Sequence, residues 1–205
     1  MFAVARTGGG TKWKEQLADE LHKPVKTKFR RRRVIANGVD DIWSADLVDM
    51  QWSQENKGFK HLLNVIDVFS KYAWSIPIKD KMGKSITDAF KKIVKTSRRR
   101  PKKLWVDQGT EFYNRVFRGW PEENDVEMYS VYNEGKAVVV ERFNRTMKER
   151  MWRYFSANNT HRYYDILDTL ISSYNAKYHR SVKMSPKDAS LKKNEQKCTE
   201  TCMVI

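Results

Sequence analysis

Apolar and polar residues along this chain form a pattern that predicts strands first and helices later. Three runs rich in Trp, Leu, Val and Ile follow one another closely, with short polar breaks between them. These runs are Ile42 to Met50, Lys60 to Phe69 and Tyr72 to Ile78. The short connections predict an antiparallel meander. In the first run apolar residues occupy both odd and even positions, which is typical of a strand covered on both faces.

Helical spacing begins after the third run and returns several times toward the C-terminus. Apolar residues three and four apart predict helices, and two further short apolar runs predict strands. In chain order these elements are a helix over 85–96, a strand over 104–106, a helix over 111–120, a strand over 126–131, a long helix from Val140 to beyond Tyr154, a helix with an apolar seam from Tyr164 to Tyr178, and a short helix from Pro186. This order predicts a mixed α/β fold, a ribonuclease H-like five-stranded sheet flanked by helices.

Composition shifts along the chain divide it into three parts. Residues 1–39 form a basic arm, in which the stretch from Lys23 to Arg33 holds no acidic residue. We expect that stretch to be solvated, to contact phosphates or to act as a nuclear import signal. Residues 40–190 carry the periodic elements and are the predicted core domain. Residues 191–205 are a polar tail that we expect to be disordered.

The charge balance favours a polyanionic partner. The chain has 40 basic and 25 acidic residues and a net charge of +15. Nucleic acid is the commonest partner of such a protein, and a soluble basic protein without one is the alternative. No apolar run approaches the roughly 18 residues of a membrane helix, so we expect no membrane partner. Without a targeting signal other than the basic arm, the expected location is the cytoplasm, or the nucleus if that arm is read as an import signal.

Cysteine usage is sparse. Cys198 and Cys202 are the two cysteines, so a disulfide framework is not expected and a reducing compartment fits. The last four residues begin at Cys202 and have the form of a prenylation box, although an irregular chain end explains them equally simply.

Three carboxylates stand where chemistry could use them. Asp46 lies inside the first strand, where an unsatisfied charge is costly, Asp107 ends the fourth strand, and Glu141 begins the long helix. If the first and fourth strands are neighbours, Asp46 and Asp107 approach a common point and the helix supplies Glu141. Three such carboxylates repel one another unless hard cations such as Mg²⁺ or Mn²⁺ neutralise them. Two such ions support phosphodiester cleavage or transfer. The alternative is that all three are surface or capping carboxylates.

Other acidic residues receive lesser roles. We expect Glu111 to occupy the first turn of a helix, near the positive end of its dipole. Glu134, in a polar loop, is a rival for the third position. Asp67 and Asp49 are expected to be structural neighbours of the site. Basic residues that would contact DNA are Arg98, Arg99 and Arg100 before the fourth strand, and Arg145 and Lys148 on the long helix. The last two share a stripe with Glu141 and the aromatic Trp152.

The sequence around these acids resembles the catalytic core of retroviral and retrotransposon integrases. The similarity is carried by WSADL at 43–47, VDQGTEF at 106–112 and VERFNRT at 140–146, and it continues through YHRS at 178–181 and MSP at 184–186. It covers roughly residues 40 to 190, the predicted integrase catalytic core domain. The sequence of the third motif is most similar to that of integrases of eukaryotic transposable elements, including the Polinton/Maverick type, and of host genes derived from them.

The resemblance implies a metal-dependent polynucleotidyl transferase that processes DNA 3′ ends and transfers the strands to a target. Asp46, Asp107 and Glu141 match the acidic triad, which holds two Mg²⁺ or Mn²⁺ ions per site. Arg145 and Lys148 match basic positions that contact DNA, and Lys136 lies in the segment matching the flexible active-site loop. The implied partners are element-end and target DNA, in a homodimer or higher multimer. The implied location is the nucleus.

The chain departs from the family pattern in three ways. The gap between Asp107 and Glu141 is 33 residues, shorter than most retroviral members leave. Neither a zinc-binding His/Cys module nor a full C-terminal DNA-binding barrel is found. We therefore expect a fragment, a truncated element copy or a domesticated gene product. Two alternatives stay open: a domesticated DNA-binding protein with little or no catalysis, and a ribonuclease acting on RNA–DNA hybrids.

Overall fold

A computed structural model describes residues 34–50, 54–131 and 137–202, without the side chains of 200–202. The elements follow in the order β1 (Ile42–Asp49), β2 (His61–Asp67), β3 (Ala73–Ile78), α2 (Gly83–Ser97), β4 (Lys103–Val106), α3 (Arg115–Glu123), β5 (Glu127–Tyr129), α4 (Val138–Asn158), α5 (Leu167–Ala176), α6 (Pro186–Ala189), η1 (Lys192–Asn194) and α7 (Glu195–Cys202). No helix in these described ranges has both the length and the apolar character that crossing a membrane requires.

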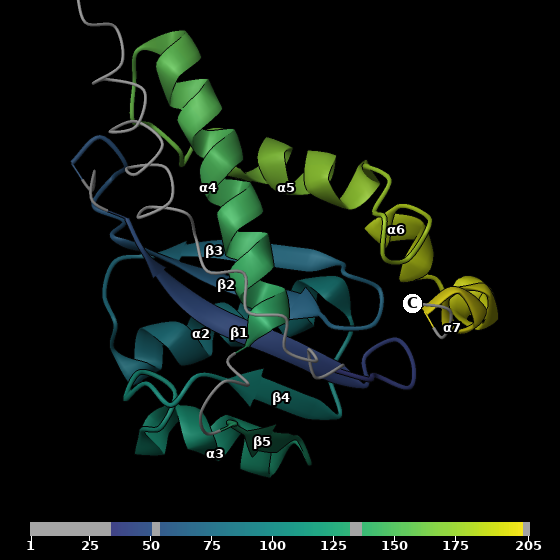
Figure 1. The fold of residues 1–205 in the computed structure, drawn as a ribbon. Coiled ribbons are helices and arrows are strands. Elements are labelled where there is room, and N and C mark those ends of the chain that lie inside the picture. The colour runs from purple at the N-terminus through teal and green to yellow at the C-terminus, as the bar shows by residue number, and fades with distance from the viewer. Residues whose placement is uncertain (1–33, 51–53, 132–136, 203–205) are drawn as a thin grey trace, which may run out of the picture. The chain divides into compact units, whose positions relative to one another are not determined.

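The five strands form one mixed sheet in the order β3-β2-β1-β4-β5 (Figure 1). The pairs β1–β2 and β2–β3 are antiparallel, and the pairs β1–β4 and β4–β5 are parallel. The predicted meander is therefore confirmed, and the condition for bringing Asp46 near Asp107, that the first and fourth strands are neighbours, is met. A parallel pair needs a crossover, which α2 supplies between β3 and β4. The result is the predicted ribonuclease H-like sheet with flanking helices.

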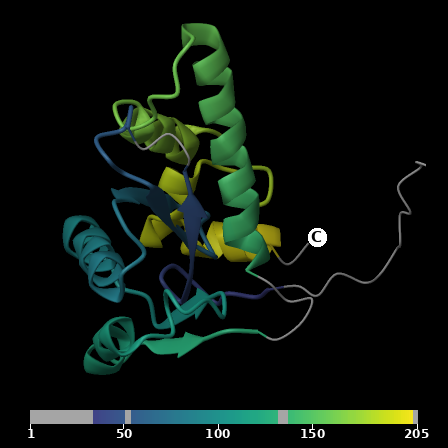
Figure 2. The ribbon, with the colours of Figure 1, turned by 90° about the vertical axis from the view of Figure 1, so that its left-hand side faces the viewer.

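Helices cover both faces of the sheet, and alternate residues of β1 point to opposite layers. Ile42 and Val48 pack with the apolar side of α4 and with α5, whereas Trp43 and Ala45 pack with α2 and α3. The two ribbon views agree, with α4 across one face and α2 on the other (Figures 1 and 2). Asp46 has the parity of Ile42 and Val48, so it belongs to the face that α4 covers.

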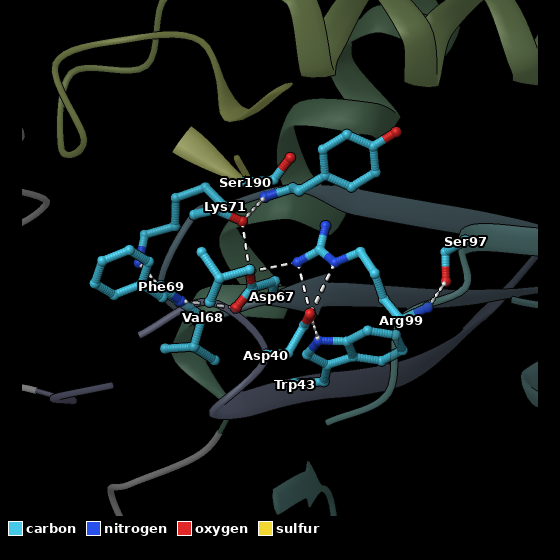
Figure 3. A network of polar contacts seen from close by, with 12 residues as sticks. Asp40, Trp43, Asp67, Val68, Phe69, Lys71, Ser97, Arg99 and Ser190 are labelled. Atoms are coloured by element: carbon cyan, nitrogen blue, oxygen red, sulfur yellow. Dashed lines mark hydrogen bonds and ion pairs between the residues drawn. The ribbon is translucent and has the colours of Figure 1, made fainter. Parts of the chain in front are cut away.

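An ion-pair network ties the beginnings of β1 and β4 to the end of β2 (Figure 3). The Arg99 guanidinium lies 2.7 Å from Asp40 Oδ1 and 2.8 Å from Asp67 Oδ2, and it stacks over Trp74 with 5.0 Å to the ring centroid. The Trp43 indole N–H donates to Asp40 at 2.9 Å. Asp67 is fully buried and also accepts from the Ser70 hydroxyl at 2.6 Å. The network links three chain segments, so its role is to hold the sheet together.

Two helix starts differ from the sequence prediction. The helix predicted from Glu111 begins only at Arg115, because the Asn114 side chain accepts from the Phe117 N–H at 2.9 Å and caps it there. The helix predicted from Tyr164 begins at Leu167 and ends at Ala176. Tyr178 therefore lies beyond the helix, and 62% of its surface is exposed. Helical spacing marked the right regions but could not mark the caps.

The expectation of a disordered tail from residue 191 is wrong as far as residue 202. Residues 192–202 form η1 and α7, and Cys198 is fully buried against Phe69 and Val182. A polar helix can dock through one small apolar residue, which composition alone does not reveal. The tail also contacts the end of the predicted arm, because the Val39 N–H donates to Glu195 Oε1 at 2.8 Å. Residues 1–33 of that arm lie outside the described residues.

Candidate active site

Asp46 lies in β1, and Asp107 directly follows β4, the strand that pairs with β1. In the parallel pair of β1 and β4, Ala45 is opposite Val106, and each aspartate is the next residue along its strand. Successive residues of paired parallel strands stay in step, so the two carboxylates face the same region. The structure thus brings together two of the three predicted site residues.

The surroundings of Asp46 keep its negative charge uncompensated. Its Oδ1 accepts from the Leu47 N–H at 2.8 Å and its Oδ2 accepts from the Asn144 side-chain amide at 2.6 Å. Burial raises the pKa of Asp46, these two hydrogen bonds lower it, and the carboxylates of Asp107 and Glu111 raise it again. The net shift of the pKa is upward, so an ionised Asp46 is costly here unless a cation approaches.

Asp107 is exposed and directly follows β4. Its Oδ1 accepts from the Gln108 N–H at 3.0 Å. The Glu111 carboxyl folds back over Gly109, where a Cβ would lie 2.2 Å from Glu111 Cδ. Glu111 is therefore a turn residue within electrostatic reach of Asp46, and the expectation that it begins a helix is wrong.

Glu141 stands apart from the two aspartates. It lies in the first turn of α4, where its backbone N–H donates to the Ala137 carbonyl at 3.0 Å, and its side chain is exposed. Over residues 34–50, 54–131 and 137–202, no three His, Cys, Asp or Glu side chains are gathered closely enough to hold a metal ion. Asn144, one helical turn after Glu141, is the α4 residue that reaches Asp46. The rival Glu134 lies outside the described residues.

A shallow, open hollow runs along one face of α4 from Glu141, lined by α4 residues, and is called the groove below. Arg145, Lys148 and Trp152 line it together with Asn144, so the stripe predicted from the sequence does share one surface. Both basic side chains are exposed, and 51% of the Trp152 surface is accessible. Glu149 and Arg153 complete the lining. The groove therefore connects a carboxylate with a row of cations, which is suited to a phosphate backbone.

The other predicted DNA contacts lie elsewhere. Arg98 and Arg100 are exposed but precede β4, whereas Asp107 follows it. Four strand residues, about 13 Å, separate the two ends. The prediction that Arg99 contacts DNA is wrong. Its side chain is turned inward to Asp40 and Asp67, so it is not available to phosphates. Lys136 lies outside the described residues.

Sequence reasoning missed a row of polar residues beneath α4. Ser75, Asn64 and Asp46 are directly opposite one another across β3, β2 and β1. Asn144 lies against this row and donates to Asp46. The available signal was Asn64 itself, a polar residue between Leu63 and Val65 in the middle of a buried strand. Asn144 stood in one of the quoted motifs without a role.

The donor chemistry fits a hard divalent cation. Asp46 and Asp107 offer oxygen ligands only, as Mg²⁺ and Mn²⁺ prefer, and the carboxylates of Asp107 and Glu111 raise the pKa of Asp46 in a way that a cation would reverse. Both Asp46 oxygens are held by one donor each, which leaves lone pairs free on each oxygen. The two aspartates thus suit a metal, and Glu141 would complete the set from α4.

Comparison with known proteins finds similarity to integrases and transposon-derived proteins. Residues 36–131 match the family model described as the integrase core domain. A transposon-derived protein of Caenorhabditis elegans is 30% identical over 138 residues, 67% of this chain and 48% of that protein. The Pro-Pol polyprotein of simian foamy virus type 1 is 28% identical over 133 residues, 64% of this chain and 11% of the polyprotein. The chain thus spans about half or less of these relatives.

Solved structures share the fold. The HTLV-2 integrase catalytic core domain, determined in complex with magnesium, superposes with a TM-score of 0.62 at 15% identity, over 75% of this chain and 97% of that one. A chain of the simian T-cell lymphotropic virus intasome gives a TM-score of 0.70 at 16% identity, over 81% of this chain and 60% of that one. Residues 36–131 thus match an integrase core domain model, with similar sequences in transposon-derived and retroviral proteins, and the chain shares the ribonuclease H-like fold of the retroviral structures.

Proposed function

We propose that this chain is the catalytic core of a DNA integrase or transposase, a polynucleotidyl transferase that processes DNA 3′ ends and joins them to a target. The observation that carries the proposal is the pairing of Asp46 with Asp107 at one sheet edge, with Glu141 at the head of a cationic groove on α4. The family match over residues 36–131 supports the same reaction.

Each group has a role in this reaction. Asp46 and Asp107, with Glu141 from α4, are the ligands of two Mg²⁺ or Mn²⁺ ions. When bound, the ions supply activation of an attacking hydroxyl and stabilisation of the leaving oxygen. Arg145 and Lys148 hold the DNA backbone along the groove, and Lys136, Arg98 and Arg100 are further proposed contacts. The magnesium in the HTLV-2 structure supports this choice of cation.

The partners and the biological setting are part of the proposal. The intasome relative supports assembly with element-end and target DNA as a dimer or higher multimer. We propose an origin in a transposable element of the Polinton/Maverick type or a host gene derived from one, with a nuclear location. The transposon-derived nematode protein supports the element origin. Terminal repeats flanking the reading frame would support a mobile element, and a lone exon in a host gene would support domestication.

A second candidate function is DNA binding without turnover. The observation that favours it is the position of Glu141, which is not gathered with Asp46 and Asp107 among the described residues. DNA binding needs only the basic groove, whereas catalysis needs Glu141 to approach the two aspartates.

One assay separates the candidates. Duplex DNA, a donor duplex with a free 3′ end and an RNA–DNA hybrid are each incubated with the protein and Mn²⁺. The proposal expects joined DNA products that Asp107→Asn abolishes. Tight DNA binding with no product supports the binding protein, and cleavage confined to the hybrid supports a ribonuclease.

A further inference from the structure

The row of polar residues under α4 forms a continuous chain of hydrogen bonds that ends on Asp46. The Ser75 hydroxyl lies 2.5 Å from Asn64 Oδ1, Asn64 Nδ2 lies 2.7 Å from Asn144 Oδ1, and Asn144 Nδ2 lies 2.6 Å from Asp46 Oδ2. Asn64 and Asn144 are 2% and 8% exposed, so water does not compete for these bonds. Buried polar groups are costly unless they are fully paired. A row of hydrogen-bonded side chains beneath α4 is therefore a candidate for a functional role.

The directions of these bonds are mutually consistent and are fixed from the Asp46 end. An ionised carboxylate can only accept, so the Asn144 nitrogen donates to Asp46 Oδ2. The Asn144 oxygen then faces Asn64 and accepts from the Asn64 nitrogen. The Asn64 oxygen is left to accept from the Ser75 hydroxyl. Rotation of either amide by 180° would set two acceptors against each other.

The consequence for Asp46 is a fixed carboxylate. Oδ2 is held by Asn144 and Oδ1 by the Leu47 N–H, so both torsions of the side chain are determined. We infer that Asn64 is a positioning residue, which acts with Ser75 through Asn144 to orient the Asp46 carboxylate toward a divalent cation. The inference rests on the proposed function because it takes Asp46 as a metal ligand. Groups that orient a ligand in this way typically change metal affinity by about 10- to 100-fold when removed.

The test compares a loss variant with a matched control. Asn64→Leu keeps the branched shape of the side chain and adds no charge, and it removes the donor that holds the Asn144 oxygen. Asn175→Leu makes the same change at another buried asparagine, whose side chain bonds to the backbone N–H and C=O of Ala73 in β3. Mn²⁺ affinity is measured by electron paramagnetic resonance, and the Asn144 side-chain amide is followed by ¹⁵N–¹H NMR of the metal-free protein. The inference expects about 10- to 100-fold weaker Mn²⁺ binding and faster amide exchange for Asn64→Leu, and unchanged affinity for folded Asn175→Leu.

A double variant separates positioning from stability. Asn64→Leu leaves the Ser75 hydroxyl without its acceptor, and Asn64→Leu with Ser75→Ala removes that defect. The inference expects the double variant to regain part of the urea midpoint that the single variant loses, and to regain none of the Mn²⁺ affinity. Recovery of affinity together with stability would show a purely structural role and overturn it.

Two results have distinct meanings for the two proposals. If Asn64→Leu binds Mn²⁺ as tightly as wild type, the inference is overturned, whatever the protein does to DNA. If Mn²⁺ affinity depends on Asn64 as expected but wild type joins no DNA, the inference stands and the proposed reaction falls.

Discussion

Asp46 and Asp67 are both aspartates in buried strands, and the chain satisfies them differently. Asp67 receives a cation from within the chain, because Arg99 lies 2.8 Å away, and the Ser70 hydroxyl donates as well. Asp46 receives two neutral donors, Leu47 and Asn144. The negative charge of a carboxylate that is ion-paired within the chain is already neutralised. A carboxylate held only by neutral donors still carries a charge that a bound cation could neutralise. This difference fits the proposed role of Asp46 as a metal ligand and the structural role of Asp67.

The Arg99 network gives a stability prediction. Arg99→Met leaves the fully buried Asp67 without its cation, and breaking a buried pair in this way costs about 3–5 kcal/mol of unfolding free energy. Arg98→Met, the exposed neighbour, is the control and should change the unfolding free energy by less than about 0.5 kcal/mol. Urea denaturation measures both, and equal effects would contradict a structural role specific to Arg99.

His179 gives a pH prediction. Burial lowers the pKa of His179 to about 4, with the cations Lys71 and Arg142 adding to the effect. The folded protein therefore binds fewer protons than the unfolded chain between the ordinary pKa of 6.5 and about 4. Stability is full above this window and falls as the pH is lowered through it, by on the order of 2 kcal/mol.

The measurement is urea unfolding of wild type and His179→Asn at pH 7.0 and 4.5. The wild type should lose more stability between these conditions than the variant does. A variant that follows the same pH dependence would show that another group controls it.

At the scale of elements, α4 joins the two halves of the site. Its buried side carries Phe143 and Met147 into the core, and Asn144 on that side reaches Asp46. Its exposed side carries Glu141, Arg145 and Lys148 along the groove. Residues three and four apart share a helix face, so one helix presents the acid and the cations in a fixed order. A shift of α4 would therefore move Glu141 and Asn144 together.

The groove predicts a specific change in DNA binding. Arg145→Ala with Lys148→Ala removes two proposed phosphate contacts, and the slope of log affinity against log salt should become shallower by about 2. Lys91→Ala with Lys95→Ala removes two exposed cations from α2, on the other face of the sheet, and is the control of equal charge. Fluorescence anisotropy over a salt series measures both slopes, and equal losses would indicate that charge alone matters.

At the scale of the whole molecule, the arrangement of the sheet could be predicted from the sequence. Short polar breaks between Ile42 and Ile78 predicted the meander, and the apolar run before Asp107 predicted a strand, which the structure places beside β1. These features depend on local periodicity and on topology rules, which a single sequence carries. The carboxylate pair of Asp46 and Asp107 followed from them.

The rest depended on contacts between distant residues. Arg99 was grouped with its neighbours as a DNA contact because nothing local distinguishes it from Arg98, and only the fold brings Asp67 to it. Cys198 sat in a polar segment whose docking partner, Phe69, is far away in the sequence. The direction of the Asn64 and Asn144 amides depends on strand register, which composition does not specify.

The central claim is that Asp46 inside β1, Asp107 directly after β4 and Glu141 at the start of α4 support DNA joining with divalent cations. The most direct measurement is single-turnover DNA joining with Mn²⁺ by wild type, Glu141→Gln and Glu149→Gln. Glu149 lines the same groove on the same helix, so its variant removes the same charge from the same surface. The account predicts at least about a 100-fold lower rate for Glu141→Gln, with metal-free DNA affinity unchanged, and a rate within about twofold of wild type for Glu149→Gln. Equal rates for wild type and Glu141→Gln would contradict it.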